Sequence, residues 1–217
     1  MGVFGFAVVV ALLLTPQRRA FREKWIWIAG AIALAIFIPN LIWNIQHAWP
    51  FLELMRNVRE SGRDVTLGPV VYVVQQIMVM NPVTFPIWLA GLSWLFFARD
   101  AKAFRALGWI FAVTFAFFML VRAKDYYTAP VYPIALAAGA IVLERAIAAT
   151  RQRWLKPASI VIVLAFGAHI APLVIPILTP AALIRYMNAL PYPVQASERS
   201  HMEASLPHHF AWSFGWE

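Results

Sequence analysis

The sequence contains no cysteine, which excludes a disulfide framework and a thiolate metal site. Charged residues are also scarce: they make up 13% of the 217 residues, against about 25% in soluble domains. The chain instead holds 62% hydrophobic residues, arranged in long runs. A soluble domain of this length could not bury so much apolar surface. The composition therefore predicts a polytopic membrane protein.

The sequence also lacks the short motifs of common catalytic and metal sites. It has no nucleophile elbow, no glycine-rich phosphate loop and no metal-ligand spacing. His208 and His209 are adjacent, so their side chains splay apart and are predicted to be a solvated pair. His169 stands alone in an apolar run, where we expect it to bond a backbone carbonyl or a neighbouring helix. The sequence therefore assigns no metal and leaves the catalytic residues unknown.

Apolar runs separated by polar breaks predict about five to six membrane segments. The first run, residues 2–14, would reach only about 20 Å as a helix, less than the hydrocarbon core of about 30 Å. The fold class is thus an all-α, polytopic transmembrane helical bundle. We expect residues 1–178 to form the membrane domain and residues 179–217 an external tail. The remaining segments are predicted at residues 25–45, 69–97, 107–121, 131–143 and 158–178.

Three of these regions have special features. Residues 50–60 alternate apolar and polar positions as an amphipathic external helix does, lying on the membrane or over a cavity. Asn81-Pro82 predicts a break between a helix over residues 69–80 and a second one ending at Phe97. Such a break is tolerated in a membrane only where protein or a wet cavity covers it. Residues 131–143 are rich in alanine and glycine, which suits close helix packing.

The net charge of +8 is concentrated in three basic loops, at residues 15–24, 98–106 and 144–157. These loops hold eleven cations and three anions, whereas the rest of the chain holds seven of each. This is the positive-inside pattern, so the charge predicts a membrane orientation and removes the case for a nucleic-acid partner. In this predicted orientation the three loops are cytoplasmic and the C-terminus is external. The eleven cations are Arg18, Arg19, Arg22, Lys24, Arg99, Lys102, Arg105, Arg145, Arg151, Arg153 and Lys156.

The candidate site is the polar break at residues 121–133, which separates two apolar runs on the predicted external side. In it Arg122 and Lys124 could face lipid phosphates, and Tyr126 and Tyr127 could sit at headgroup depth. The alternative is that these side chains are interfacial anchors and nothing more.

We expect two other polar features to converge on this break. One is Gln75-Gln76 together with Asn81, and the other is the helix that carries Glu53, Arg56 and Arg59. An outer pocket with two or more cations and few carboxylates favours an anionic headgroup, because Arg can hold a phosphate in a fork and Lys adds a compact charge.

Several stretches resemble the bacterial branch of the dolichyl-phosphate-mannose–protein mannosyltransferase superfamily, which has a GT-C fold. The likeness covers roughly residues 1–145 and continues more weakly to Glu217. Its most specific part is Lys124-Asp125-Tyr126-Tyr127-Thr128-Ala129-Pro130-Val131-Tyr132-Pro133. The other stretches are Ile38-Pro39-Asn40-Leu41-Ile42-Trp43-Asn44, His47-Ala48-Trp49-Pro50, Asn81-Pro82 and Leu89-Ala90-Gly91-Leu92.

The resemblance implies a glycosyltransferase that moves a sugar, with inversion, from a polyprenyl-phosphate-linked donor to a glycan, lipid or protein acceptor. It implies the periplasmic side of the bacterial inner membrane, with Arg122 and Lys124 facing the lipid phosphate and Tyr126 and Tyr127 around it. In such enzymes an acidic residue of the first external loop is the base. Here the chain starts inside a helix, so that residue has no counterpart. The 217-residue chain is expected to be an inactive C-terminal portion.

Two other functions stay open from the sequence. The Asn81-Pro82 break and the prolines of residues 158–178 are also features of transporters, so the chain could be a transporter fragment or a non-catalytic membrane subunit. It could also be an intact small protein that binds polyprenyl lipids and catalyses nothing.

Overall fold

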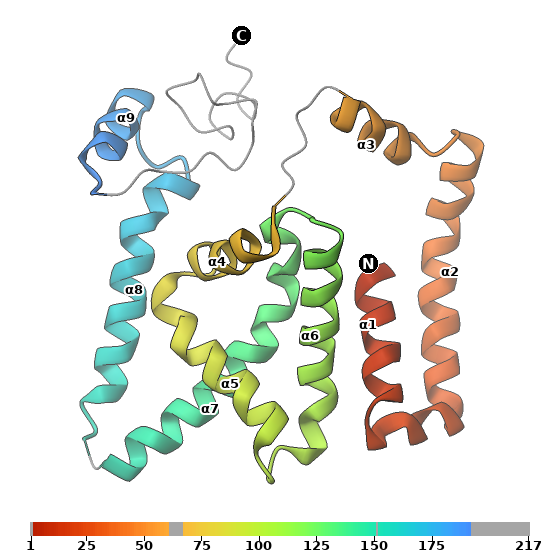
Figure 1. Cartoon of the computed structure of the whole chain (residues 1–217), viewed down its shortest axis with the longest axis horizontal. Coiled ribbons are helices and arrows are strands. Elements are labelled where there is room, and N and C mark those ends of the chain that lie inside the picture. Colours follow the sequence, from red (N-terminus) through yellow and green to blue (C-terminus); the bar gives the residue numbers. More distant parts are fainter. Residues whose placement is uncertain (1, 61–66, 151, 192–217) are drawn as a thin grey trace.

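The computed structural model describes residues 2–60, 67–150 and 152–191, and every regular element in these ranges is helical (Figure 1). The α-helices are α1 (Gly2–Leu13), α2 (Lys24–Gln46), α3 (Pro50–Glu60), α4 (Pro69–Val79), α5 (Phe85–Phe97), α6 (Arg105–Leu120), α7 (Tyr132–Thr150), α8 (Leu155–Val174) and α9 (Pro180–Ala189). Short 3₁₀ helices connect them: η1 (Pro16–Arg22), η2 (Pro82–Thr84), η3 (Lys102–Phe104) and η4 (Asp125–Val131).

The number of membrane segments agrees with the prediction. Four helical stretches are long and apolar enough to cross a membrane, and two sharply bent pairs raise the total to as many as six. The bent pairs are α1 with η1, at 108°, and α4 with η2–α5, at 99°. The prediction of an all-α polytopic bundle with about five to six segments is therefore confirmed.

The predicted break at Asn81-Pro82 is also confirmed, and its local geometry explains the bend. Asn81 has a φ of 65°, and its side-chain oxygen accepts a hydrogen bond from the Val83 amide at 3.1 Å. Asparagine tolerates this backbone region because its side chain can bond the main chain two residues on. As a result α4 runs nearly perpendicular to α5 and lies across the bundle (Figure 1).

The predicted loop at residues 144–157 is shorter than expected, because α7 runs on to Thr150. Residues 144–150 are rich in alanine, which favours helix, so α7 continues beyond its apolar residues. Helix α8 likewise begins at Leu155, since Pro157 is tolerated in a first turn. It ends at Val174 because Pro176 disfavours helix at Ile175. The prediction of a span over residues 158–178 therefore lay too far toward the C-terminus, because α8 covers Leu155–Val174.

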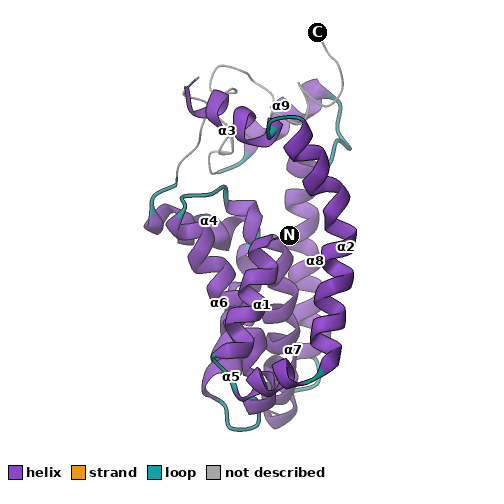
Figure 2. Ribbon diagram, turned by 90° about the vertical axis from the view of Figure 1, so that its right-hand side faces the viewer, coloured by secondary structure: helices purple, strands orange, loops and turns teal. Residues whose placement is uncertain are grey.

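The three basic connections lie at one end of the bundle, which we call the basic end (Figures 1 and 2). They are η1, the α5–α6 connection with η3, and the α7–α8 connection. Helices α3 and α9 and the α6–α7 connection lie at the other end, called the opposite end here. The sequence prediction that these loops share one end is confirmed. The predicted external tail, residues 179–217, falls mostly outside the described residues, apart from α9.

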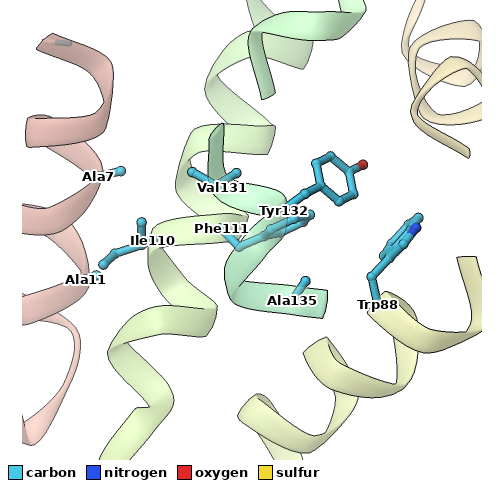
Figure 3. Close-up of a cluster of buried hydrophobic side chains, with 8 residues drawn as sticks. All are labelled: Ala7, Ala11, Trp88, Ile110, Phe111, Val131, Tyr132 and Ala135. Carbon is cyan, nitrogen blue, oxygen red and sulfur yellow. The ribbon is translucent and has the colours of Figure 1, made fainter. Parts of the chain in front are cut away.

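The core forms where α1, α5, α6 and α7 meet (Figure 3). The Tyr132 ring packs edge-on against Trp88, at 5.5 Å between centroids, and against Phe111, at 5.1 Å. On the α1 side, Ala7 and Ala11 are fully buried, so α1 approaches α6 through its small side chains. Aromatic packing thus ties α7 to α5 and α6, while alanines bring in α1.

Helices α5 and α7 cross at glycines. A Cβ atom added to Gly91 would come within 3.0 Å of the Ala135 carbonyl oxygen and of the Gly139 backbone. A Cβ atom added to Gly139 would similarly strike the Ile87 carbonyl. The backbones therefore touch, as they do where small residues form the contact between membrane helices. This confirms the prediction of close packing from the alanine and glycine content of α7.

Candidate functional site

The polar break at residues 121–133, called the tyrosine break below, starts with a helix cap that has an arginine where glycine is usual. Arg122 has a φ of 52° and donates its amide to Met119 O at 3.2 Å, while the Ala123 amide bonds Phe118 O at 2.9 Å. These two bonds form a Schellman motif, which ends a helix with a left-handed residue. A residue with a side chain costs roughly 1 kcal/mol in that conformation. The fold thus places an exposed arginine at the end of α6 in spite of backbone strain.

Lys124, Tyr126 and Tyr127 form a compact group beyond this cap. The Lys124 Nζ atom lies 5.9 Å from the centre of the Tyr126 ring, within the range of a cation–π contact. The Tyr126 and Tyr127 rings meet edge to face at 5.0 Å, and Tyr127 also packs on Phe118 at 5.6 Å. Both tyrosines are about two-fifths exposed, at 44% and 40%. The group therefore presents a half-buried cation beside the ring of Tyr126, with a second accessible ring, that of Tyr127, next to it.

A buried polar network fixes the tyrosine break from beneath. The Tyr72 hydroxyl on α4 bonds the Thr128 hydroxyl on η4. Gln76 donates its amide to Asp125 O at 2.8 Å and accepts the Tyr132 hydroxyl at 3.2 Å. The four side chains Tyr72, Gln76, Thr128 and Tyr132 are each no more than 1% exposed. Because unbonded polar groups are costly in such a place, the network holds α4 and the break in one arrangement.

Sequence reasoning identified Gln75-Gln76 but missed the partners of this network. One signal is spacing: Tyr72 and Gln76 are four residues apart in the predicted helix over residues 69–80, so they share one helix face. This pattern predicts a polar face on that helix. It does not say that Thr128 and Tyr132 are its partners.

The predicted convergence of polar features is correct in part. Gln76 does meet the tyrosine break, but the Asn81 side chain reaches the Val163 carbonyl on α8, at 3.5 Å. Helix α3 is amphipathic as predicted, yet it lies apart from α4 and the α6–α7 connection (Figure 1). The reason is that α3 follows α2, which stands beside the core without burying a residue in it. Glu53 and Arg56 are thus not part of the site, and Arg56 bonds Glu60 on its own helix at 2.7 Å.

Asp125 and His169 have structural partners. The Asp125 carboxylate accepts a hydrogen bond from the adjacent Tyr126 amide at 2.9 Å, and its carbonyl belongs to the buried network. His169 Nδ1 lies 3.0 Å from the Tyr186 hydroxyl on α9, so the predicted bond to a neighbouring helix is confirmed. The pair His208-His209 lies outside the described residues.

The tyrosine break brings two cations and two accessible tyrosines to one loop. Arg122 and Lys124 are the cations at the break, and the aromatic rings of Tyr126 and Tyr127 can cover an apolar or sugar group beside them. Within residues 2–60, 67–150 and 152–191, no group of three His, Cys, Asp or Glu could hold a metal ion. Of the four predicted residues, the structure joins Lys124, Tyr126 and Tyr127 in direct contact and places Arg122 at the start of the same loop.

Comparison with known proteins gives a match at the start of the chain. Residues 1–43 match a family model described as dolichyl-phosphate-mannose-protein mannosyltransferase. This range covers α1, η1 and most of α2, about one fifth of the sequence, and it does not include the tyrosine break. No curated protein and no solved structure matches the chain. The match suggests a membrane glycosyltransferase of the mannosyltransferase kind, built here on several apolar helices.

Proposed function

We propose that this chain belongs to a membrane glycosyltransferase that takes a sugar from a polyprenyl-phosphate-linked donor and passes it to a glycan, lipid or protein acceptor. The observation that carries the proposal is the mannosyltransferase-family match over residues 1–43. In this proposal Arg122 and Lys124 bind the donor phosphate, and Tyr126 and Tyr127 lie against the adjoining sugar or prenyl group. The site faces the periplasm of a bacterial inner membrane.

The geometry supports this assignment of roles. The tyrosine break lies at the opposite end from the basic loops (Figure 1). A donor phosphate at the break is therefore not drawn away by the many cations of those loops. A phosphate beside a half-buried lysine gains a charge-assisted hydrogen bond. The buried network under the break keeps Lys124 and the tyrosines in place, so little ordering is needed when the lipid binds.

The second candidate is a non-catalytic membrane subunit or part of a transporter. The observation that favours it is the 99° bend between α4 and η2–α5, because broken helices near the membrane also form transport sites. A transporter of lipid phosphates would share the binding chemistry but would not cleave the phosphate–sugar bond. Release of free polyprenyl phosphate from a labelled donor, measured with the full-length enzyme to which the chain is proposed to belong, therefore separates the two functions.

The donor site is tested with Lys124→Ala and Arg122→Gly, measured by binding of polyprenyl phosphate and of neutral polyprenol to the detergent-solubilised chain. Lys124→Ala should weaken phosphate binding by about 10- to 150-fold, the equivalent of a charge-assisted hydrogen bond. Arg122→Gly removes the second cation while suiting the left-handed backbone, so binding should fall and folding should be unharmed. Polyprenol binding should not change.

Two further variants serve as controls. Lys124→Arg should retain part of the preference for the phosphate. Arg185→Ala removes an exposed cation of α9 at the same end of the bundle and should leave binding unchanged. If Lys124→Ala prefers the phosphate as strongly as the unchanged chain does, Lys124 is an interfacial anchor and the donor site lies elsewhere.

The orientation is tested by cysteine labelling, which is simple in a chain without cysteine. Asn188→Cys, on α9, should react with a membrane-impermeant maleimide added to intact cells. Lys102→Cys, at the basic end, should react only after the membrane is opened. Equal labelling of both from outside, or the reverse pattern, would contradict a periplasmic tyrosine break.

A further inference from the structure

Helix η1 lies across the basic end of the bundle. It meets α1 at 108°, and it leads directly into α2 at the same end (Figure 1). The turn is made by Thr15, whose hydroxyl bonds Ala11 O at 2.8 Å, and by Pro16, which opens η1. Where α1 follows the membrane normal, η1 therefore runs along the membrane surface.

Two cavities flank η1, and both are lined by Arg18 and Arg19. One, of about 510 Å³, is completed by Leu13, Phe21 and Arg22. The other, of about 290 Å³, is completed by Leu14, Thr15 and Pro16. Among the residues that the structure describes, no Asp or Glu lines either cavity. Each cavity joins guanidinium groups to an apolar wall, a combination that fits an anionic group attached to a hydrocarbon chain.

Aromatic side chains next to these cavities mark the depth of a membrane interface. The Trp27 indole donates to Phe21 O at 2.9 Å, and the Phe21 and Trp27 rings lie 6.4 Å apart. Lys24 Nζ is 5.1 Å from the Trp25 ring. Trp25 and Trp27 are about two-thirds exposed, at 65% and 66%. Exposed tryptophans beside cations are typical of the headgroup level of a bilayer.

A larger cavity at the same end is less suited to an anion. It measures about 710 Å³ and is lined by Glu144, Ile147, Ala148, Arg153 and Lys156. Lys156 Nζ lies 2.6 Å from the Glu144 carboxylate, so one of its two cations is already neutralised. The charge at the basic end therefore favours the cavities at η1.

We propose that the cavities at η1 bind the headgroup of an anionic phospholipid of the surrounding bilayer. Arg18, Arg19 and Arg22 contact the phosphodiester, and Leu13 and Phe21 lie against the start of the acyl chains. This lipid is distinct from the proposed sugar donor, because the tyrosine break lies at the other end of the bundle (Figure 1). Its role is to fix the α1–η1–α2 hairpin at the membrane surface.

The test is lipid binding to the chain in neutral detergent, followed by native mass spectrometry with phosphatidylglycerol and phosphatidylcholine as probes. The unchanged chain should retain phosphatidylglycerol in preference. The triple variant Arg18→Gln, Arg19→Gln, Arg22→Gln should bind it more weakly, by about 5-fold for each arginine removed. The triple Arg→Lys variant keeps the charge and should retain most of the binding, which separates charge from folding.

A matched control removes three cations elsewhere at the basic end: Arg99→Gln, Lys102→Gln, Arg153→Gln. It should leave phosphatidylglycerol binding nearly unchanged. If this control loses as much binding as the η1 variant, the lipid responds to overall surface charge and the proposed site does not exist. Equal binding of the two lipids by the unchanged chain would also overturn the proposal. The donor site is tested separately, with polyprenyl phosphate and variants of Lys124 and Arg122, so the two proposals can fail independently.

Discussion

The crossing of α5 and α7, compared with the loosely packed helices α2 and α8, shows how little hydropathy says about packing. In the stretch that includes α7, the 18-residue segment with a mean hydropathy of 1.6 has 33% of its residues buried inside the molecule. The corresponding segments in α2 and α8 reach 2.1 and 2.0, yet neither contains a buried residue. The less apolar segment is therefore the better packed one. In a membrane, lipid satisfies an apolar side chain as well as protein does, so shape decides which helices touch.

Glycine is present in both regions, but it matters in only one. Gly91 and Gly139 have the neighbouring helix backbone against them, whereas Gly30 of α2 and Gly167 of α8 have nothing within 4 Å. Small residues permit a close crossing without causing one. What distinguishes α5 and α7 is that their glycines meet at the same height, beside the aromatic cluster around Tyr132.

The largest expected effect comes from adding a methyl group where α5 and α7 touch. Gly91→Ala and Gly139→Ala should each lower the free energy of unfolding by about 3 kcal/mol, the upper part of the range for overpacking, because the new methyl group strikes backbone. Unfolding by sodium dodecyl sulfate in mixed micelles, followed by circular dichroism, measures the change.

Gly30→Ala and Gly167→Ala are the matched controls. Both should be neutral or should stabilise by up to about 1 kcal/mol, since alanine is the better helix former and space is open there. Equal destabilisation at all four glycines would mean that α2 and α8 are packed as closely as α5 and α7.

A smaller effect is expected from the buried network, which joins α4 to the same packed region. Gln76→Ala leaves the Tyr132 hydroxyl and the Asp125 carbonyl without this partner, and should lower the free energy of unfolding by about 1–3 kcal/mol. The same unfolding measurement applies. Gln75→Ala, at the half-buried neighbouring position, should cost less. If both variants lower the free energy of unfolding by the same amount, the network does not determine the position of α4.

The smallest effect is expected at the basic end, where an exposed ion pair joins α7 to the α5–α6 connection. Arg145 lies 2.5 Å from the Asp100 carboxylate, and its hydrogen bond holds the pKa of that carboxyl below its usual value of 3.8. The stabilisation is therefore present at neutral pH and is lost as the pH falls through the lowered pKa.

Asp100→Asn should then be slightly less stable than the unchanged chain at pH 7. The difference should vanish once the pH is well below 3.8, because the carboxyl is then protonated in both the folded and unfolded chain. Thermal unfolding of both proteins, from pH 7 to well below pH 3.8, measures this difference in stability. A difference that persists in strong acid would assign the effect to the Trp94–Asp100 hydrogen bond or to packing.

Part of the candidate site could be predicted from the sequence, because polar residues are rare in this chain. Two cations and several tyrosines between apolar runs already indicate a membrane interface, and Asn81-Pro82 indicates a broken helix. The role of Tyr72 and Thr128 could not be predicted in the same way. Each looks like an ordinary residue of an apolar or mixed segment until α4 folds back over η4.

The sequence by itself determined the positions of the membrane helices, the breaks between them and the separation of charge between the two ends. These follow from local properties: the length of apolar runs, the backbone limits of proline and the distribution of Arg and Lys. The tertiary structure decided that α5 and α7 cross at Gly91 and Gly139, that Gln76 lies under the tyrosine break and that α3 stays away from it. These depend on contacts between residues some fifty positions apart, such as Gln76 and Tyr132, and no local pattern of hydrophobicity specifies which face of one membrane helix will meet another.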